Sequence, residues 1–194
     1  MHLEYLVFVG AMFSLLAGIP YIRNTLLGKT KPHLVTWGIW ATAPFIATAA
    51  AISKGVGWAV LPVFMSGFVP ALIVITALVS HHKIWKPSRF DLLCGTLSIA
   101  ALLGWWITKE ANIAIAFSIA SDGLAGLPTL RKSWKYPESE TGVGYTVGVF
   151  TACTAFAAAK QFDFATIAPP IYFILMNGSL SFAVYRHRIL SFFR

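Results

Sequence analysis

Seven long apolar segments follow one another along the chain, separated by short connections that hold most of the charged residues. Each segment is close to the length of about 20 residues that an α-helix needs to cross a lipid bilayer. Their apolar residues are continuous and rich in Ala, Leu and Ile, whereas barrel strands would alternate apolar and polar positions. We therefore predict seven helices, at 5–22, 34–53, 58–80, 90–108, 112–130, 142–160 and 165–185.

The overall composition adds a reason to place these helices in a membrane. Of the 194 residues, 57% are hydrophobic and 11% are charged, whereas soluble domains carry about 25% charged residues. A soluble protein needs polar surface to face water, so we expect the apolar excess to face lipid. The formal net charge of +8 comes from basic residues between the apolar segments, so it does not predict a nucleic-acid partner.

The charges of the connections predict how the chain crosses the membrane. The first, third and fifth connections and the C-terminal tail are basic, while the other connections are nearly neutral. Because basic loops stay on the cytoplasmic side, we predict an outer N-terminus and a cytoplasmic C-terminus in the inner or plasma membrane. The first segment has no basic stretch before it and no small-residue cleavage motif after it, so we expect a retained span rather than a signal peptide.

Part of the sequence occurs twice at a constant offset. LAGIPYIR at 16–23 and LAGLPTLR at 124–131 lie 108 positions apart. Matched prolines and a matched arginine at one offset are less easily explained by apolar composition than matches of Ala or Leu. Outside these two stretches, the same offset pairs Trp37 with Tyr145 and Pro62 with Pro170.

The repeat predicts how the chain is divided. Residues 1–83 would form a first three-helix repeat, 84–111 a linker helix, and 112–194 a second three-helix repeat with a short cytoplasmic tail. Because a single helix separates the two copies, both would have the same orientation in the membrane. We therefore predict parallel repeats related by an axis along the membrane normal.

This three-plus-one-plus-three plan resembles that of the SWEET/PQ-loop group of transporters. Local similarity lies in IPYIRNTLLGKTKP at the end of the first segment, APFIATAAA in the second and MNGSLSFAVY in the seventh. The resemblance implies an all-α membrane protein with seven transmembrane helices, in which a linker helix joins two parallel three-helix bundles. It also implies transport of a small polar solute, such as a sugar, an amino acid or a vitamin-like compound, by alternating access.

Asp122 is an acidic residue near the middle of the fifth segment, with no charged neighbour within a helical turn. A charge at that depth costs about 3 kcal/mol on insertion scales, and such residues usually face a cavity or a partner. Its carboxylate would bind a cationic solute or couple a proton to transport, and resemblance to proton-coupled amino-acid exporters of the PQ-loop group supports such coupling. The alternative is a protonated side chain that hydrogen-bonds to a facing helix for packing.

Five further residues are candidates for solute binding. By resemblance, Asn177 corresponds to the asparagine of the seventh SWEET helix that lines the solute cavity, and we expect Tyr172 on the same face. Ser66 is the candidate from the third segment, and the repeat pairs the aromatic residues Trp37 and Tyr145. The alternative for Asn177 is an interhelical hydrogen bond, and the alternative for the aromatic residues is a place at the membrane interface.

Prolines inside the predicted helices are candidate hinges. A helix proline removes one backbone hydrogen bond, and in a membrane a neighbour or water has to satisfy the freed carbonyl. Pro20 and Pro128 are repeat counterparts, and Pro44 matches by resemblance one of the helix prolines of SWEETs. These residues would bend during alternating access, or they would only fix static bends.

Other chemistry is not predicted. Cys94 and Cys153 lie singly in apolar segments, which favours packing over a metal site. The sequence has no Gly-rich phosphate loop, H-E-x-x-H or G-x-S-x-G motif, so we expect no enzyme activity and no cofactor. The expected partners are a small polar solute and the lipid bilayer, with homo-oligomerisation left open. The alternatives to a transporter are a receptor or sorting protein on the same scaffold and a structural membrane subunit.

Overall fold

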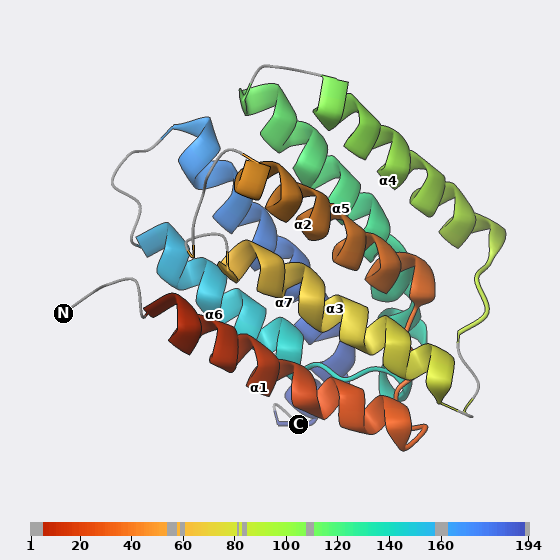
Figure 1. Ribbon diagram of the computed structural model, residues 1–194. Helices are drawn as coiled ribbons and strands as arrows, with labels where there is room; N and C mark the ends of the chain where they lie inside the picture. Colours follow the sequence, from red (N-terminus) through yellow and green to blue (C-terminus); the bar gives the residue numbers. More distant parts are fainter. Residues whose placement is uncertain are drawn as a thin grey trace. The chain divides into compact units, whose positions relative to one another are not determined.

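The computed structural model describes residues 6–53, 58, 61–80, 82, 85–107, 111–157 and 163–192. These residues form seven α-helices and no strand, as the apolar segments predict (Figure 1). A short 3₁₀ helix, η3, covers Pro137–Ser139. The α-helices are α1 (Leu6–Leu26), α2 (Leu34–Ser53), α3 (Leu61–Val79), α4 (Arg89–Ile107), α5 (Ala111–Lys135), α6 (Val143–Ala157) and α7 (Phe164–Phe192).

Two helices continue well beyond the apolar segments that predict them. The structure carries α5 on to Lys135 and α7 on to Phe192. An apolar segment ends at the first charged residues, but the helix itself does not have to end there. Basic residues interact favourably with the partial negative charge at a helix C-terminus, and Lys132 and Lys135 occupy the last turn of α5.

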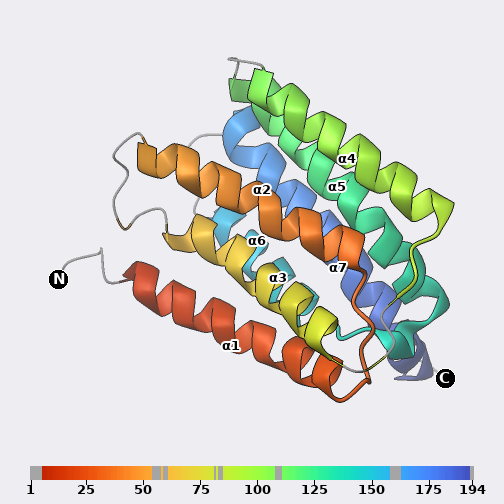
Figure 2. The same ribbon diagram turned by 45° about the vertical axis from the view of Figure 1, so that its right-hand side comes forward.

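The chain divides into two compact units, Met1–Lys86 and Pro87–Arg194. In the first unit, α3 packs against both α1 and α2 (Figure 2). In the second unit, α7 packs against both α5 and α6, and α4 packs on α5. The third helix of each predicted repeat therefore lies between the first and the second. The parallel orientation of the two repeats stays a prediction.

Glycine allows close helix contacts inside the first unit. A Cβ atom on Gly67 of α3 would lie 2.8 Å from the backbone oxygen of Ala41 in α2. A Cβ atom on Gly18 of α1 would lie 2.6 Å from the Cγ1 atom of Val69 in α3. Small residues at helix contacts let backbones approach closely, so glycine at these two positions allows α3 to lie close to its neighbours.

Large apolar side chains remain exposed on the outside of the described helices. Among them is a set on α4, consisting of Leu92, Leu93, Leu97, Ile99 and Leu103. Within the described residues, one helix is long and apolar enough to cross a membrane, over Ile167–Ser191 of α7. Val63–Val79 and Val143–Cys153 are shorter apolar helices. Length and apolar character thus give weak evidence for a membrane location.

Candidate functional site in the second unit

Asp122 and Tyr172, two of the predicted site residues, are in direct contact in the second unit. The Tyr172 hydroxyl on α7 donates a 2.5 Å hydrogen bond to the Asp122 Oδ2 atom on α5. Gly123 lies beside the ring, and a Cβ atom at that position would be in ordinary van der Waals contact with it, 3.5 Å from the Tyr172 hydroxyl oxygen. The sequence leaves Asp122 without an identified partner, and the structure supplies one from another helix.

The residue before Asp122 holds α5 against α4. The Ser98 hydroxyl on α4 donates a 2.5 Å hydrogen bond to the Ser121 backbone oxygen and lies 3.0 Å from the Ser121 hydroxyl. Both serines are fully buried. Asp122 is therefore anchored through its neighbour to one helix and through its own carboxylate to another.

This arrangement determines what the Asp122 site can do chemically. A carboxylate is an acceptor with two oxygens and about four lone-pair sites, and the Oδ2 atom of Asp122 accepts the Tyr172 hydrogen bond. Hydrogen bonds that involve an ionised group are stronger than neutral ones, and a poorly hydrated environment strengthens them further. The pair can accept a cationic donor from a solute, or it can take up and release a proton.

Asn177 lies on a different face of α7 from Tyr172. A Cβ atom on Gly148 of α6 would lie 2.8 Å from the Asn177 Cγ and Oδ1 atoms, so Asn177 faces α6 whereas Tyr172 faces α5. The expectation that the two residues share a face is wrong. Five helical residues correspond to a rotation of about 140°, which separates the two side chains around the helix.

The two polar atoms of the Asn177 amide differ in their hydrogen bonds to the described residues. Its nitrogen donates a 3.0 Å hydrogen bond to the Phe173 backbone oxygen in the same helix. Among the described residues, the side-chain oxygen accepts no hydrogen bond, although it lies close to Gly148. One turn further along, the hydroxyls of Thr146 and Ser181 are 2.8 Å apart and link α6 to α7. The contact between α6 and α7 therefore includes polar groups.

Ser66 and Trp37, the two candidates in the first unit, already have hydrogen bonds there. The Ser66 hydroxyl donates a 2.7 Å bond to the Val63 backbone oxygen, and the residue is exposed. Trp37 is buried, and its indole nitrogen donates a 3.0 Å bond to the Tyr21 hydroxyl. A role for either residue in one site with Asp122 stays a prediction.

Tyr145, the repeat counterpart of Trp37, belongs to a buried polar cluster that the sequence does not reveal. Its hydroxyl donates a 3.1 Å hydrogen bond to the Glu140 Oε1 atom, and Glu140 forms an ion pair with Lys132. The two charged side chains are 1% and 0% exposed for Lys132 and Glu140, respectively. In the sequence, Glu140 only reduces the net positive charge of the fifth connection. Its place just before α6 was an available signal, because acidic groups are favoured near helix N-termini.

The three candidate hinge prolines all lie inside helices. Pro20 is in α1, Pro44 in α2 and Pro128 in α5. Since proline has no backbone N–H, Pro20 and Pro128 leave equivalent carbonyls, those of Leu16 and Leu124, without the usual helical donor. Movement at these positions stays a prediction. Pro62 is in α3, but its side chain lies outside the described part of the structure.

Comparison of the chain with protein-family models, with curated proteins and with solved structures finds no match. The resemblance to the SWEET/PQ-loop group therefore depends on the residues quoted from the sequence.

Proposed function

We propose that the protein is an integral membrane protein with seven transmembrane helices, and that it transports a small polar solute by alternating access. Solute would bind beside Asp122 and Tyr172 and would extend to the α6 side of α7, where Asn177 would be a second polar contact. Pro20, Pro44 and Pro128 would provide bending points in three of the moving helices.

The exposed surface of α4 supports the membrane location. Leu92, Leu93, Leu97, Ile99 and Leu103 are between 46% and 57% exposed in this helix. Apolar patches larger than a few hundred Å² are rare on the surface of soluble monomers, whereas side chains of this kind are suited to contact with acyl chains. α6 and α7 continue the pattern, with Phe150 71% and Leu175 64% exposed.

The hydrogen bond between Asp122 and Tyr172 is the observation that carries the transport proposal. Polar and ionisable groups inside membrane helices are expensive, and they mark solute pathways and proton relays. A carboxylate favours a solute with an amino group, or a proton that accompanies the solute. The side-chain oxygen of Asn177, which accepts no hydrogen bond from the described residues, would accept one from the solute, so an amino acid or a related amine fits the chemistry best.

Flux measurements on reconstituted protein test this proposal. Small polar solutes are first screened for thermal stabilisation of the purified protein, and those that stabilise it are followed in proteoliposomes. We expect saturable uptake or exchange that is lost in Asp122→Asn. Asp163→Asn is the matched control, because Asp163 is exposed beside the first turn of α7. Flux that survives in Asp122→Asn would contradict the role of the acid.

The same measurements separate a transporter from a receptor on the same scaffold. A receptor would bind its ligand tightly, and Asp122→Asn would weaken that binding, but no solute would cross the vesicle membrane. Binding without flux would therefore overturn transport and keep the site. If no solute binds and none is transported, the site proposal itself fails.

A further inference from the structure

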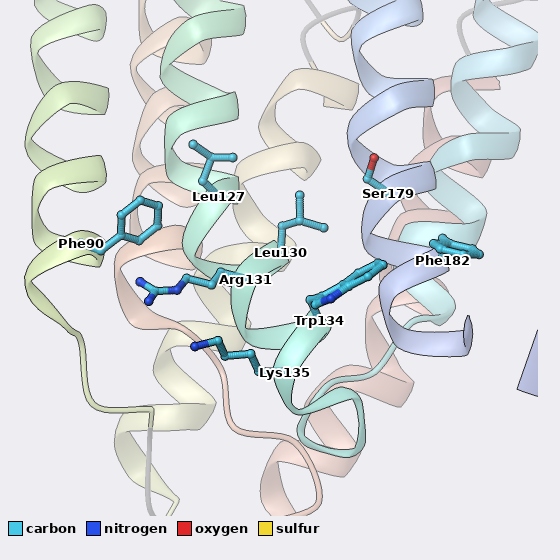
Figure 3. Close-up of a pocket in the computed structure, with 8 residues that line it drawn as sticks. All are labelled: Phe90, Leu127, Leu130, Arg131, Trp134, Lys135, Ser179 and Phe182. Atoms are coloured by element: carbon cyan, nitrogen blue, oxygen red, sulfur yellow. The ribbon is translucent and has the colours of Figure 1, made fainter. Parts of the chain in front are cut away.

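A pocket of about 520 Å³ lies near the C-terminal end of α5, where α4 and α7 flank it (Figure 3). All of it belongs to the second unit. Its walls are mainly apolar and aromatic, and two basic side chains contribute to it. The residues that matter here are Phe90 from α4, Leu127, Arg131, Trp134 and Lys135 from α5, and Phe182 from α7.

The lining of the pocket changes from apolar to basic along α5. Leu127, Arg131 and Lys135 follow one another at intervals of four residues, so they lie on one face of the helix. Figure 3 shows Leu127 higher on this face and the two basic side chains closer to the helix end. Trp134 extends instead toward α7, where its ring lies 6.2 Å from that of Phe182. Apolar surface and positive charge are thus separated within one pocket.

The two basic groups differ from their neighbour Lys132 in their ion pairing. Arg131 and Lys135 form no ion pair within the described part of the chain, whereas their neighbour Lys132 pairs with Glu140. The Arg131 guanidinium lies 4.9 Å from the centre of the Phe90 ring, which leaves its N–H donors available. Both Arg131 and Lys135 are exposed.

Two backbone carbonyls at the end of α5 accept hydrogen bonds from Arg186 rather than from Arg131 or Lys135. Its guanidinium donates hydrogen bonds to the backbone oxygens of Ser133, at 3.3 Å, and Trp134, at 2.6 Å. The same group lies 5.0 Å from the centre of the Trp134 ring. Arg186 thus fixes both the helix end and the Trp134 side of the pocket, and the charges of Arg131 and Lys135 remain for a ligand.

We infer that this pocket binds an anionic membrane phospholipid, with the phosphate at Arg131 and Lys135 and an acyl chain along Leu127, Phe90 and Phe182. Basic pockets between membrane helices on the cytoplasmic side bind acidic lipid headgroups. Trp is enriched at the headgroup level, which suits Trp134. A free phosphate ion would use the cations but not the apolar walls, so the lipid is the better match. The inference depends on the proposed membrane location.

Titration of the purified protein in neutral detergent tests the site, with the unfolding temperature as the readout. The probes are short-chain phosphatidylglycerol, phosphatidylcholine with the same chains, and glycerol 3-phosphate. We expect phosphatidylglycerol to stabilise the wild type most strongly. In Arg131→Gln/Lys135→Gln, about 30-fold more of this lipid should be needed, since each basic residue near an anionic lipid contributes about a factor of five.

The control variant is Arg23→Gln/Lys29→Gln, which removes the same charge from exposed positions in the first unit. Arg23 is also the repeat counterpart of Arg131. The control should respond to phosphatidylglycerol as the wild type does. The inference is overturned if both double variants lose the response equally, or if Arg131→Gln/Lys135→Gln keeps it. Equal stabilisation by glycerol 3-phosphate would show a soluble-phosphate site and would also overturn it.

Two further measurements separate the possible failures. Brominated phosphatidylglycerol should quench the fluorescence of the wild type more than that of Trp134→Phe, and equal quenching would overturn the lipid site without use of the double variant. Extraction of membranes with alkaline carbonate tests the location alone. A chain that is released by carbonate contradicts the membrane proposal, whereas a retained chain with no preference for phosphatidylglycerol contradicts only the lipid site.

Discussion

Thr25 of α1 and Ser133 of α5 make equivalent hydrogen bonds at positions related by the sequence repeat. The Thr25 hydroxyl donates to the Tyr21 backbone oxygen at 2.9 Å, and the Ser133 hydroxyl donates to the Thr129 backbone oxygen at 2.8 Å. Both donors are buried. Each lies five residues after the proline of its copy. The two units therefore share a local hydrogen-bond pattern as well as matching residues. Substitutions in one copy can be compared with the equivalent substitutions in the other.

The repeated prolines should affect transport more than stability. In Pro20→Ala and Pro128→Ala the missing backbone donor returns, so helix bending becomes more costly. If bending accompanies alternating access, flux should fall on the order of tenfold, which corresponds to about 1.4 kcal/mol of barrier, without a lower unfolding temperature. Pro70→Ala in α3 is the control, since its repeat position is Gly178. Equal flux in all three variants would identify static bends.

Removal of the Tyr172 hydroxyl should destabilise the contact between α5 and α7. Tyr172→Phe deletes the donor to Asp122 and should lower the free energy of unfolding by about 1–3 kcal/mol, as is typical when a hydrogen bond to a charged group is lost. The control is Tyr185→Phe in the same helix. Within the described residues, the Tyr185 hydroxyl makes no hydrogen bond, so this change should be nearly neutral. A neutral Tyr172→Phe would mean that the Asp122 bond contributes nothing to folding.

The buried ion pair between Lys132 and Glu140 should be far more sensitive than the exposed charges around it. Glu140→Gln leaves Lys132 buried without its counter-ion, and such a loss costs about 3–5 kcal/mol. Glu138→Gln in η3 changes an exposed acid and should alter stability by less than about 0.5 kcal/mol. Unfolding in mixed micelles by increasing fractions of a denaturing detergent gives both values. Similar losses for the two variants would argue against a buried pair.

Two glycines of α6 form a matched pair for the contact with α7. A Cβ atom on Gly148 would lie 2.8 Å from Asn177, whereas a Cβ atom on Gly144 meets nothing within 4 Å. Gly148→Ala should therefore displace the Asn177 amide, weaken solute binding and lower stability. Gly144→Ala should be neutral or stabilising by up to about 1 kcal/mol, because Ala is the better helix former. Solute titrations and unfolding of both variants give the comparison, and identical behaviour would contradict the close approach of Asn177.

Hydrophobic patterning predicts the helices of this chain well because each apolar segment is long and continuous. It locates the helix ends less well, since α5 and α7 continue through basic residues to Lys135 and Phe192. Apolar character marks the part of a helix that suits lipid, whereas backbone hydrogen bonding and the helix dipole decide where the helix ends.

The candidate site was predictable only in part. Asp122 stands out because it is the single acid in its apolar segment, but its bond to Tyr172 depends on the packing of α5 against α7. Tyr172 and Asn177 do not share a face because five helical residues correspond to a rotation of about 140°. Lys132 and Glu140 were missed because a sum of loop charges contains no information on which charges are buried together.

Thiol labelling at position 122 in membranes tests most directly the proposal that Asp122 belongs to a solute site that water can reach within the bilayer. The measurement uses Asp122→Cys and Leu97→Cys in a background with Cys94→Ala and Cys153→Ala, together with a small, charged, membrane-impermeant thiol reagent. Leu97 is 46% exposed on α4, so it should face lipid. We expect the cysteine at position 122 to be labelled and the one at position 97 to remain unlabelled. Labelling of the cysteine at position 97 but not of the cysteine at position 122 would contradict the proposal.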